Sequence, residues 1–136
     1  MQTDNLIPNG DFSQGDKEWR IYFSPGSPAW AEIRDGYCHV KEGAAAEQTL
    51  ELAAGTYYFS FECLFPEASK SYVNLALEMS GLRKQIDVRT GPDYLPYAMT
   101  FEVAAQQSGG PDLFSLALRG NQVGGKYRNV RLISID

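Results

Sequence analysis

The sequence predicts a single all-β domain, a β-sandwich or barrel of antiparallel strands. Apolar and polar residues alternate with period 2 over several stretches, and no apolar period of 3.6 persists for three helical turns. Turn-forming Gly, Pro, Asn and Asp residues separate short stretches at intervals of roughly 8–12 residues, which is the spacing typical of sandwiches and barrels. The length of 136 residues suits one domain with one hydrophobic core, so we expect residues 1–136 to fold together.

The chain opens with a motif over residues 5–12, Asn-Leu-Ile-Pro-Asn-Gly-Asp-Phe. We interpret it as a short apolar strand that a Pro-Asn-Gly turn interrupts, after which Phe12 enters the core. Trp19, which follows the turn region, is also expected in the core. A long closing strand is predicted near the other end, and in a sandwich the first and last strands are expected to lie together.

Four stretches show the clearest alternation, so each is expected to form a strand with one buried and one outer face. The positions predicted to point inward are Tyr57, Phe59, Phe61, Cys63 and Phe65; Val73, Leu75, Leu77 and Met79; Leu95, Tyr97, Met99, Phe101 and Val103; and Phe114, Leu116 and Leu118. Those predicted to point outward are Tyr58, Ser60, Glu62 and Leu64; Tyr72, Asn74, Ala76 and Glu78; Tyr94, Pro96, Ala98, Thr100 and Glu102; and Leu113, Ser115, Ala117 and Arg119.

Weaker patterns predict further strands at 19–23, 29–34, 37–41, 46–52, 82–88 and 126–135. Asp35-Gly36, between Ile33 and Tyr37, is typical of a two-residue hairpin turn. The run Ala44-Ala45-Ala46-Glu47 is compatible with a single helical turn before the strand that follows.

The charge distribution excludes two classes of partner. The net charge is −5, the pI is near 4.8, and no cluster of Lys and Arg occurs, whereas nucleic acids and anionic membranes require a basic patch. No apolar run approaches the roughly 20 residues needed to span a bilayer, and residues 1–4 do not resemble a signal peptide. Localisation stays open, and an extracellular, cell-surface or virion role would come through a parent protein.

The residues needed for catalysis are not found in a recognisable arrangement. His39 is the only histidine, and there is no Gly-x-Ser-x-Gly motif to present a nucleophile. Residues 120–126 have the glycine and lysine spacing of a phosphate-binding loop, but Tyr127 replaces the required Ser or Thr and a strand is expected to follow. Outward Glu62, Glu78 and Glu102 would serve glycoside hydrolysis only if two of them met across a cleft. We therefore predict that the chain is not an enzyme.

The two cysteines, Cys38 and Cys63, each fall inside a predicted strand. A disulfide between them is one alternative, but the preferred interpretation is a pair of buried free thiols that pack as small hydrophobic side chains. Neither cysteine has neighbours at the spacing of metal ligands, so no zinc site is predicted.

Outward aromatic residues indicate a binding surface. Trp30, Tyr58, Tyr72 and Tyr94 offer flat faces on which the C–H face of a sugar ring would stack, and nearby polar side chains would bind its hydroxyls. The alternative is that these aromatic rings cover neighbouring strands. The predicted ligand-binding residues are Trp30, Glu62, Tyr72, Asn74, Tyr94 and Arg119, with Gln85 as a further polar candidate.

Three segments resemble carbohydrate-binding modules of the family 4, 9 and 22 group. These are the opening motif with Gly15 and Trp19, the stretch 46–61, and the closing segment 127–132. The resemblance spans nearly the whole chain, although each motif is short. It implies a galactose-binding-like jelly roll that binds its ligand either in a groove on a sheet or at the loop tips.

The resemblance also implies a structural calcium ion, but the sequence departs from the family at two positions that would help to bind it. Ser13 and Asn129 stand where the family commonly has acidic residues. These departures weigh against calcium and no cofactor is expected, although Asp11, backbone carbonyls and Asp136 still offer hard oxygen ligands.

Two functions follow as hypotheses. The first is a non-catalytic module that binds a poly- or oligosaccharide by aromatic stacking and hydrogen bonds, as part of a larger parent protein or beside one. The second is a protein-interaction or assembly module of a phage tail or cell-surface complex, with the same fold and no sugar ligand, for which a homo-oligomer is one form.

Overall fold

The computed structural model describes residues 4–22, 30–41, 44–66, 71–120 and 124–135, and in this part of the chain every regular element is a strand. The strands are β1 (Arg20–Tyr22), β2 (Trp30–Arg34), β3 (Tyr37–Lys41), β4 (Ala45–Leu52), β5 (Gly55–Leu64), β6 (Ser71–Leu77), β7 (Leu82–Val88), β8 (Leu95–Val103), β9 (Asp112–Arg119) and β10 (Gly125–Ser134).

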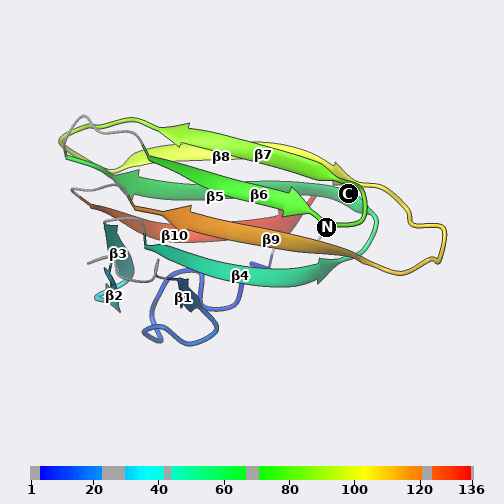
Figure 1. Cartoon of the computed structure of the whole chain (residues 1–136), viewed down its shortest axis with the longest axis horizontal. Coiled ribbons are helices and arrows are strands. Elements are labelled where there is room, and N and C mark those ends of the chain that lie inside the picture. The colour runs from blue at the N-terminus through cyan, green and yellow to red at the C-terminus, as the bar shows by residue number, and fades with distance from the viewer. Residues whose placement is uncertain (1–3, 23–29, 42–43, 67–70, 121–123, 136) are drawn as a thin grey trace.

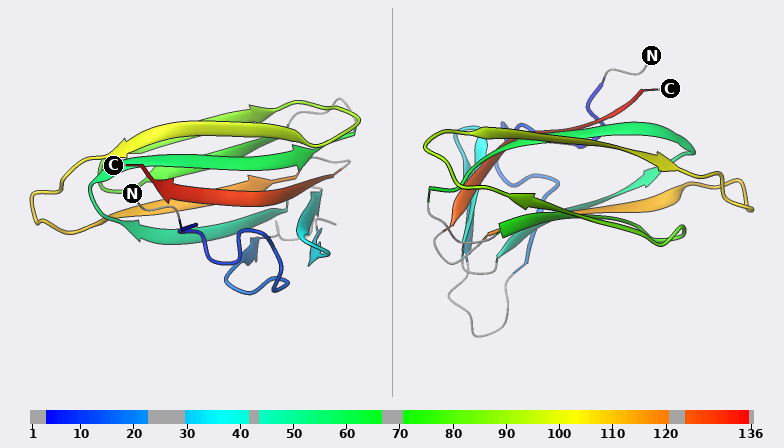
Figure 2. Two further views of the ribbon diagram at one scale, coloured as in Figure 1. Left: turned by 180° about the vertical axis from the view of Figure 1, so that it is seen from behind. Right: turned by 90° about the horizontal axis from the view of Figure 1, so that it is seen from above.

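The strands form two five-stranded sheets packed face to face (Figures 1 and 2). Sheet A has the order β1-β4-β9-β6-β7, and sheet B has the order β2-β3-β10-β5-β8. All neighbouring strands are antiparallel, and the chain repeatedly crosses from one sheet to the other, as in a jelly roll. The predicted all-β sandwich is therefore confirmed.

The core lies between the sheets and includes most of the inward positions that the alternation predicted, together with residues of the weaker strands and of β10. The fully buried side chains include Phe59, Phe61, Phe114, Leu116 and Tyr127. Aromatic contacts join the sheets: the rings of Phe101 on β8 and Phe114 on β9 are stacked with centroids 5.5 Å apart. Trp19 is only 7% exposed, so its predicted burial is confirmed. Met79 is an exception, because β6 ends at Leu77 and the Met79 side chain is exposed.

The opening motif lies along β10 without forming a strand of its own, which corrects that part of the prediction. Its backbone joins β10 through bonds from Leu6 N to the Leu132 carbonyl (2.7 Å) and from Val130 N to the Gly10 carbonyl (2.9 Å). The Asn5 side chain adds two bonds, donating to the Val130 carbonyl and accepting from Leu132 N, both at 2.9 Å. The predicted contact between the first and last segments is thus present, with half of these bonds made by the backbone and half by the Asn5 side chain.

Gly10 permits this close approach, because a Cβ atom there would clash with the Val130 carbonyl oxygen. The turn itself is organised by Asn9, whose side chain donates to the Gly15 and Lys17 carbonyls at 2.8 Å each. The Asn9 carbonyl in turn accepts a hydrogen bond from the Trp19 indole at 2.9 Å. The turn and the buried Trp19 ring therefore fix each other.

Residues 45–47 are strand, not the helical turn that their composition allowed. Ala45 and Ala46 pair with Arg119 and Leu118 of β9, and both alanines are fully buried. Pairing and burial override intrinsic helix propensity here. Residues 120–126, which have the spacing of a phosphate-binding loop, lie partly outside the described residues. The strand expected after them is present, since β10 begins at Gly125.

Cys38 and Cys63 are buried free thiols, as predicted. Both are paired with Tyr127 of β10, one from each side, so one strand separates them. Two strand spacings amount to about 9–10 Å, which is beyond the Cα separation that a disulfide spans. Burial raises the pKa of both thiols to about 12. The described part of the chain has no helix of the length and hydrophobicity needed to cross a membrane.

Candidate functional site

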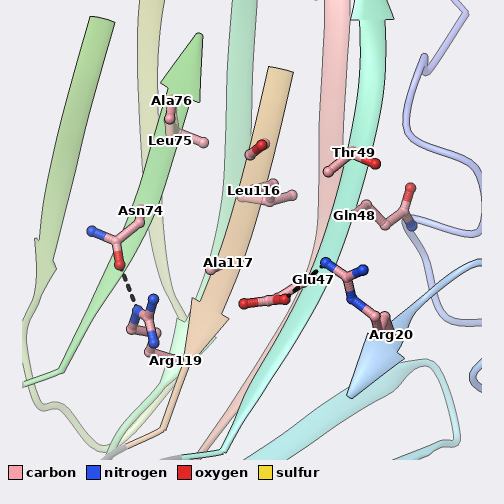
Figure 3. A pocket seen from close by; sticks show the side chains of 11 residues that line it. Arg20, Glu47, Gln48, Thr49, Asn74, Leu75, Ala76, Leu116, Ala117 and Arg119 are labelled. Carbon is pink, nitrogen blue, oxygen red and sulfur yellow. Dashed lines mark hydrogen bonds and ion pairs between the residues drawn. The ribbon is translucent and has the colours of Figure 1, made fainter. Parts of the chain in front are cut away.

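A hollow lies on the outer face of sheet A, across its central strands (Figure 3). One continuous row of paired outward residues crosses the whole sheet: Arg20, Glu47, Ala117, Asn74 and Gln85. Strands lie about 4.8 Å apart, so this row is about 19 Å long. Polar side chains stand at its ends and alanine stands at its centre.

The next row toward the other end of the strands repeats the arrangement. Thr49 pairs with Ser115, Ser115 with Ala76, and Ala76 with Arg83. Short side chains therefore occupy the middle of both rows, and they form the floor of a cavity of about 290 Å³. The hollow continues toward β7, where Asn74, Ala76 and Arg119 line it together with Arg83 and Gln85.

Arg119, at the end of β9, is held in place from several directions. Its Nε donates to Asn74 Oδ1 at 2.5 Å, and its guanidinium lies 5.8 Å from the centre of the Tyr72 ring. Its backbone carbonyl accepts hydrogen bonds from the buried hydroxyls of Tyr127 (2.6 Å) and Ser71 (2.7 Å). The core thus fixes the backbone of Arg119, while Asn74 and Tyr72 orient its side chain toward the hollow.

The opposite wall is an ion pair between Arg20 of β1 and Glu47 of β4, with 3.2 Å between Nη2 and Oε1 (Figure 3). Arg20 is mostly exposed, so this pair contributes little stability. Beside it, Gln48 turns away from the hollow and donates to the Pro8 carbonyl at 2.8 Å, which ties β4 to the opening motif.

Two tyrosines flank this face of the sheet. Tyr72 is 37% exposed, and Tyr22, at the end of β1, is 47% exposed. Tyr22 pairs with Ala45, which pairs with Arg119, so Tyr22 lies in the register row of the arginine. The face therefore combines aromatic rings, a charged guanidinium, a carboxylate and amides around a shallow floor. These are the groups that bind the C–H faces and hydroxyls of sugars.

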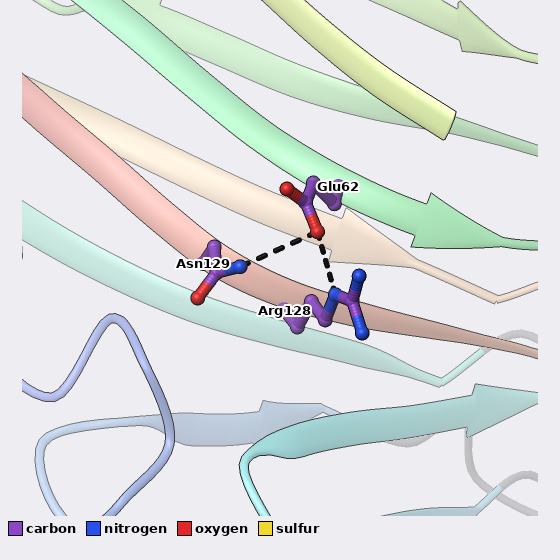
Figure 4. A network of polar contacts seen from close by, with 3 residues as sticks. All are labelled: Glu62, Arg128 and Asn129. Atoms are coloured by element: carbon purple, nitrogen blue, oxygen red, sulfur yellow. Dashed lines mark hydrogen bonds and ion pairs between the residues drawn. The ribbon is translucent and has the colours of Figure 1, made fainter. Parts of the chain in front are cut away.

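The structure divides the predicted site residues between two faces. Tyr72, Asn74 and Arg119 come together on sheet A, and Gln85 lines the extension of the hollow on the same sheet. Glu62 and Tyr94 lie on sheet B instead, where Arg128 bridges them. Its Nε donates to Glu62 Oε1 at 2.5 Å (Figure 4). Its guanidinium lies 3.7 Å from the Tyr94 ring centre. Burial raises the pKa of the Tyr94 hydroxyl, and Arg128 partly offsets this. Trp30 is the first residue of β2, which is an edge strand of sheet B, and its side chain lies outside the described part of the structure.

Sequence reasoning missed several residues of the sheet A hollow. Tyr22, Arg20 and Glu47 lie on strands whose patterns were weak, so the direction of their side chains was not predicted. The small outward residues Ala76, Ser115 and Ala117 carried a signal that was available in the alternation. Short side chains at facing positions of two central strands indicate a depression.

The acidic residues considered for hydrolysis do not converge. Glu62 pairs with Pro96, whereas Glu102 pairs with Thr56. The two glutamates are therefore separated by six residues along the strands of sheet B, or about 20 Å. Glu78 follows β6 in the other sheet. His39, on β3, pairs with Glu32 and Lys126, away from these carboxylates.

The region where the resemblance implied calcium contains one carboxylate, Asp11, beside Asn129 and the cationic Arg131. Hydrogen bonds from Ser13 lower the pKa of Asp11. Asp136 lies outside the described residues, and among those described no three His, Cys, Asp or Glu side chains are grouped to bind a metal. A calcium ion requires six to eight oxygen ligands, so the Asp11 carboxylate would supply only a small part of such a set.

Sequence comparison finds no family model and no curated protein that matches this chain. Comparison of structures finds many similar folds. The carbohydrate-binding module CBM4 superposes with a TM-score of 0.71 at 14% identity, covering 95% of this chain and 99% of the other. A family 16 carbohydrate-binding module gives 0.65 at 18% identity, with 96% and 100% covered.

Family 22 xylan-binding domains match as well. A further similar structure is the enzymatically active domain of tailspike protein 4 from bacteriophage CBA120. Its TM-score is 0.64 at 13% identity, and the match covers 96% of this chain but 21% of the tailspike chain. At these identities the comparisons show the fold, which is that of carbohydrate-binding modules of families 4, 16 and 22. The predicted resemblance in fold is confirmed.

Proposed function

We propose that this chain is a non-catalytic carbohydrate-binding module that holds a saccharide chain in the hollow of sheet A. The outer rings of Tyr72 and Tyr22 stack on sugar rings, and Glu47, Asn74 and Arg119 bind their hydroxyls. The site is open along its length, which suits a chain of sugars better than a single enclosed one.

The continuous row of polar residues that crosses sheet A over a floor of short side chains carries this proposal. The outer face of an ordinary sandwich sheet is also polar. Here, in addition, the polar residues border a depression, and the residues of each wall interact with one another. The hydrogen bond between Arg119 and Asn74 holds one wall in position before a ligand arrives, and the ion pair between Arg20 and Glu47 forms the other wall. Such preorganisation reduces the entropic cost of binding. The shared fold of the CBM4, family 16 and family 22 domains supports the same function.

Calorimetric titration against a panel of soluble neutral polysaccharides and their oligosaccharides tests the proposal. The panel contains β-1,4-glucan, β-1,3-glucan, xylan and mannan. We expect heat of binding with at least one of them, and loss of that heat in Tyr72→Ala and Arg119→Ala. Heat with none of the glycans would contradict the proposal, and so would variants that bind as tightly as the unaltered protein.

Tyr58→Ala is the matched control. Tyr58 is 38% exposed, almost the same as Tyr72, but it lies on the outer face of sheet B. This variant removes an equally exposed tyrosine without touching sheet A. We therefore expect it to bind the neutral glycan as the unaltered protein does.

A second candidate function is assembly within a larger protein such as a phage tail. The tailspike comparison favours it, because there a domain of this fold occupies about a fifth of a much longer chain. The exposed Tyr22, Tyr58 and Tyr72 would then be covered by another copy or another domain. Light scattering across a concentration series separates the two functions. A stable oligomer that Tyr72→Ala dissociates, combined with no heat from any glycan, would support assembly.

A further inference from the structure

The outer face of sheet B carries a second hollow, on the side of the molecule opposite the one just described. It is lined by Tyr58, Ser60, Glu62, Pro96, Ala98, Asn129 and Arg131 and has a volume of about 640 Å³. The side chains of Ser60 and Ala98, which are paired across β5 and β8, are short and leave the space open. An adjoining depression, also lined by Asn129 and Arg131, extends toward the opening motif.

A β-bulge in β10 creates the charge at this hollow. Arg128 pairs with Glu62 and Arg131 pairs with Ser60, so β10 takes three steps where β5 takes two. In a regular strand, residues three apart point to opposite faces. The extra residue brings Arg128 and Arg131 to the same outer face. Asn129, which lies between them in the sequence, has a left-handed backbone conformation (φ 51°). Bulges that redirect side chains are frequent near binding sites.

The two arginines have different surroundings. Arg128 already has partners, because it pairs with Glu62 (Figure 4) and its guanidinium lies over the Tyr94 ring. Glu62 also accepts a hydrogen bond from Asn129 Nδ2 at 3.3 Å, so its charge is compensated. Arg131 is exposed, and its guanidinium makes no ion pair or hydrogen bond within the described residues. The hollow therefore has a guanidinium without a direct ion-pair partner among the described residues, although the Asp11 carboxylate lines the adjoining depression.

Other polar groups around this cation also lack partners in the part of the chain that the structure describes. They are the hydroxyls of Tyr58 and Ser60 and the Asn129 side-chain carbonyl. Tyr58 pairs with Ile133 while Arg131 pairs with Ser60, so the tyrosine and the arginine are diagonal neighbours, about 7–8 Å apart at their Cα atoms. An exposed ring, a free guanidinium and unused hydroxyl and amide groups thus border one space.

We propose that this second hollow binds a carboxylate-bearing sugar, a uronic acid residue of an acidic saccharide. The planar guanidinium of Arg131 pairs with the carboxylate through two parallel hydrogen bonds, which is the geometry in which arginine binds carboxylates best. The Tyr58 ring stacks on the sugar, and Ser60 and Asn129 bind its hydroxyls. The site lies on the other sheet from the neutral-glycan site, so neither proposal depends on the other.

Titration of the full chain with oligogalacturonate and with the neutral galactose oligomer of equal length tests this site. We expect heat with the uronate only, and weaker binding as salt rises because the contact is ionic. Arg131→Gln should weaken uronate binding about tenfold to a hundredfold, the usual range for a hydrogen bond to a charged group. Arg83→Gln, which removes an exposed arginine from β7 on the other sheet, is the control and should bind as the unaltered protein does.

Two further arms make the outcome decisive. Tyr58→Ala should lose uronate binding while Tyr72→Ala keeps it, the reverse of the result expected with a neutral glycan. A short oligoglutamate peptide carries carboxylates without sugar rings and should not bind measurably. No heat with the uronate, uronate binding that survives Arg131→Gln, or equal binding of the peptide would overturn the proposal. Melting temperatures of the variants confirm that each is folded.

Discussion

At the scale of single residues, buried hydroxyl groups hold the backbone of Arg119 beside the sheet A hollow. Tyr127 is fully buried on β10, yet its hydroxyl donates across the sandwich to the Arg119 carbonyl on β9. Burial raises the pKa of this hydroxyl above its ordinary value, so it is a neutral donor near pH 7. The residue links the closing strand of sheet B to the arginine of the sheet A hollow.

Tyr127→Phe should lower the free energy of unfolding by about 1–2 kcal/mol, because it removes one buried hydrogen bond and little volume. Urea denaturation measures the loss. Tyr58→Phe is the control, since that hydroxyl is exposed and makes no hydrogen bond among the described residues. Equal stability of the two variants would show that the bond across the sandwich is unimportant.

Asp112 provides a pH-dependent contribution at the start of β9. The residue is fully buried; burial raises its pKa, but hydrogen bonds from Met79 N, Ser80 and Leu113 N outweigh burial and lower the pKa below its ordinary value of 3.8. A lowered folded-state pKa stabilises the protein above the unfolded-state value. That stabilisation is lost as the pH falls through the folded-state pKa.

We therefore expect the urea concentration at the unfolding midpoint of the unaltered protein to decrease when the pH is lowered past about 4. In Asp112→Asn this decrease should be less steep. At pH 7 this variant should be less stable than the unaltered protein, because it gives up the charged acceptor. Asp93→Asn, at an exposed carboxylate, is the control. Parallel pH curves for Asp112→Asn and the unaltered protein would rule out this role.

The buried thiols give a residue-scale test of the fold. Since burial raises the pKa of Cys38 and Cys63 to about 12, neither should react with iodoacetamide at pH 8 in the folded protein. Both should react once urea unfolds the chain. Mass spectrometry counts the alkylated thiols, and rapid modification without urea would contradict the placement of β3 and β5 beside β10.

At the scale of elements, β10 has the most roles. It pairs with β3 and β5, binds the opening motif, and carries the bulge that exposes Arg131. The motif approaches β10 so closely at Gly10 that a side chain there would clash with the Val130 carbonyl.

Gly10→Ala should therefore destabilise the protein by about 1–3 kcal/mol, as overpacking in a tight region does. Gly110→Ala is the matched control, because the nearest atom to its added Cβ is the Ser108 hydroxyl at 3.5 Å, an ordinary contact. Thermal or urea unfolding compares the two. Similar stabilities would mean that the opening motif can move away from β10 without cost.

Most strands were predictable from the sequence because alternation of apolar and polar residues directly reflects a sheet with one buried face. The opening segment was not a strand, because Asn5 uses its side chain to replace part of the backbone pairing. No periodicity encodes that substitution. The helical turn over residues 44–47 was wrong because burial between strands outweighs alanine's helix propensity.

The candidate sites were less predictable than the strands. The alternation correctly identified Tyr72, Asn74, Arg119 and Glu62 as outward, but it does not say which sheet each strand joins. Glu62 and Tyr72 were therefore grouped together, although they lie on opposite faces. The bulge that turns Arg131 outward depends on pairing between β5 and β10 and leaves no pattern in the sequence.

At the scale of the whole molecule, the two sheets present two different outer faces. Sheet A has a hollow between internally paired walls, and sheet B has a hollow beside an unpaired arginine. Because the faces are opposite, we expect the two proposed sites to be able to bind a neutral and an acidic saccharide at the same time. Each face has an exposed tyrosine of nearly equal accessibility, so reciprocal alanine variants separate their contributions.

NMR titration of the ¹⁵N-labelled chain with the glycan that gives heat tests whether the hollow of sheet A binds the neutral saccharide. We predict that the largest shift changes occur in β4, β6 and β9, at Glu47, Asn74, Ala117 and Arg119 and in the side-chain amide of Asn74. Changes confined to the loop tips, or to β5 and β10 of sheet B, would show that the saccharide does not bind in the sheet A hollow.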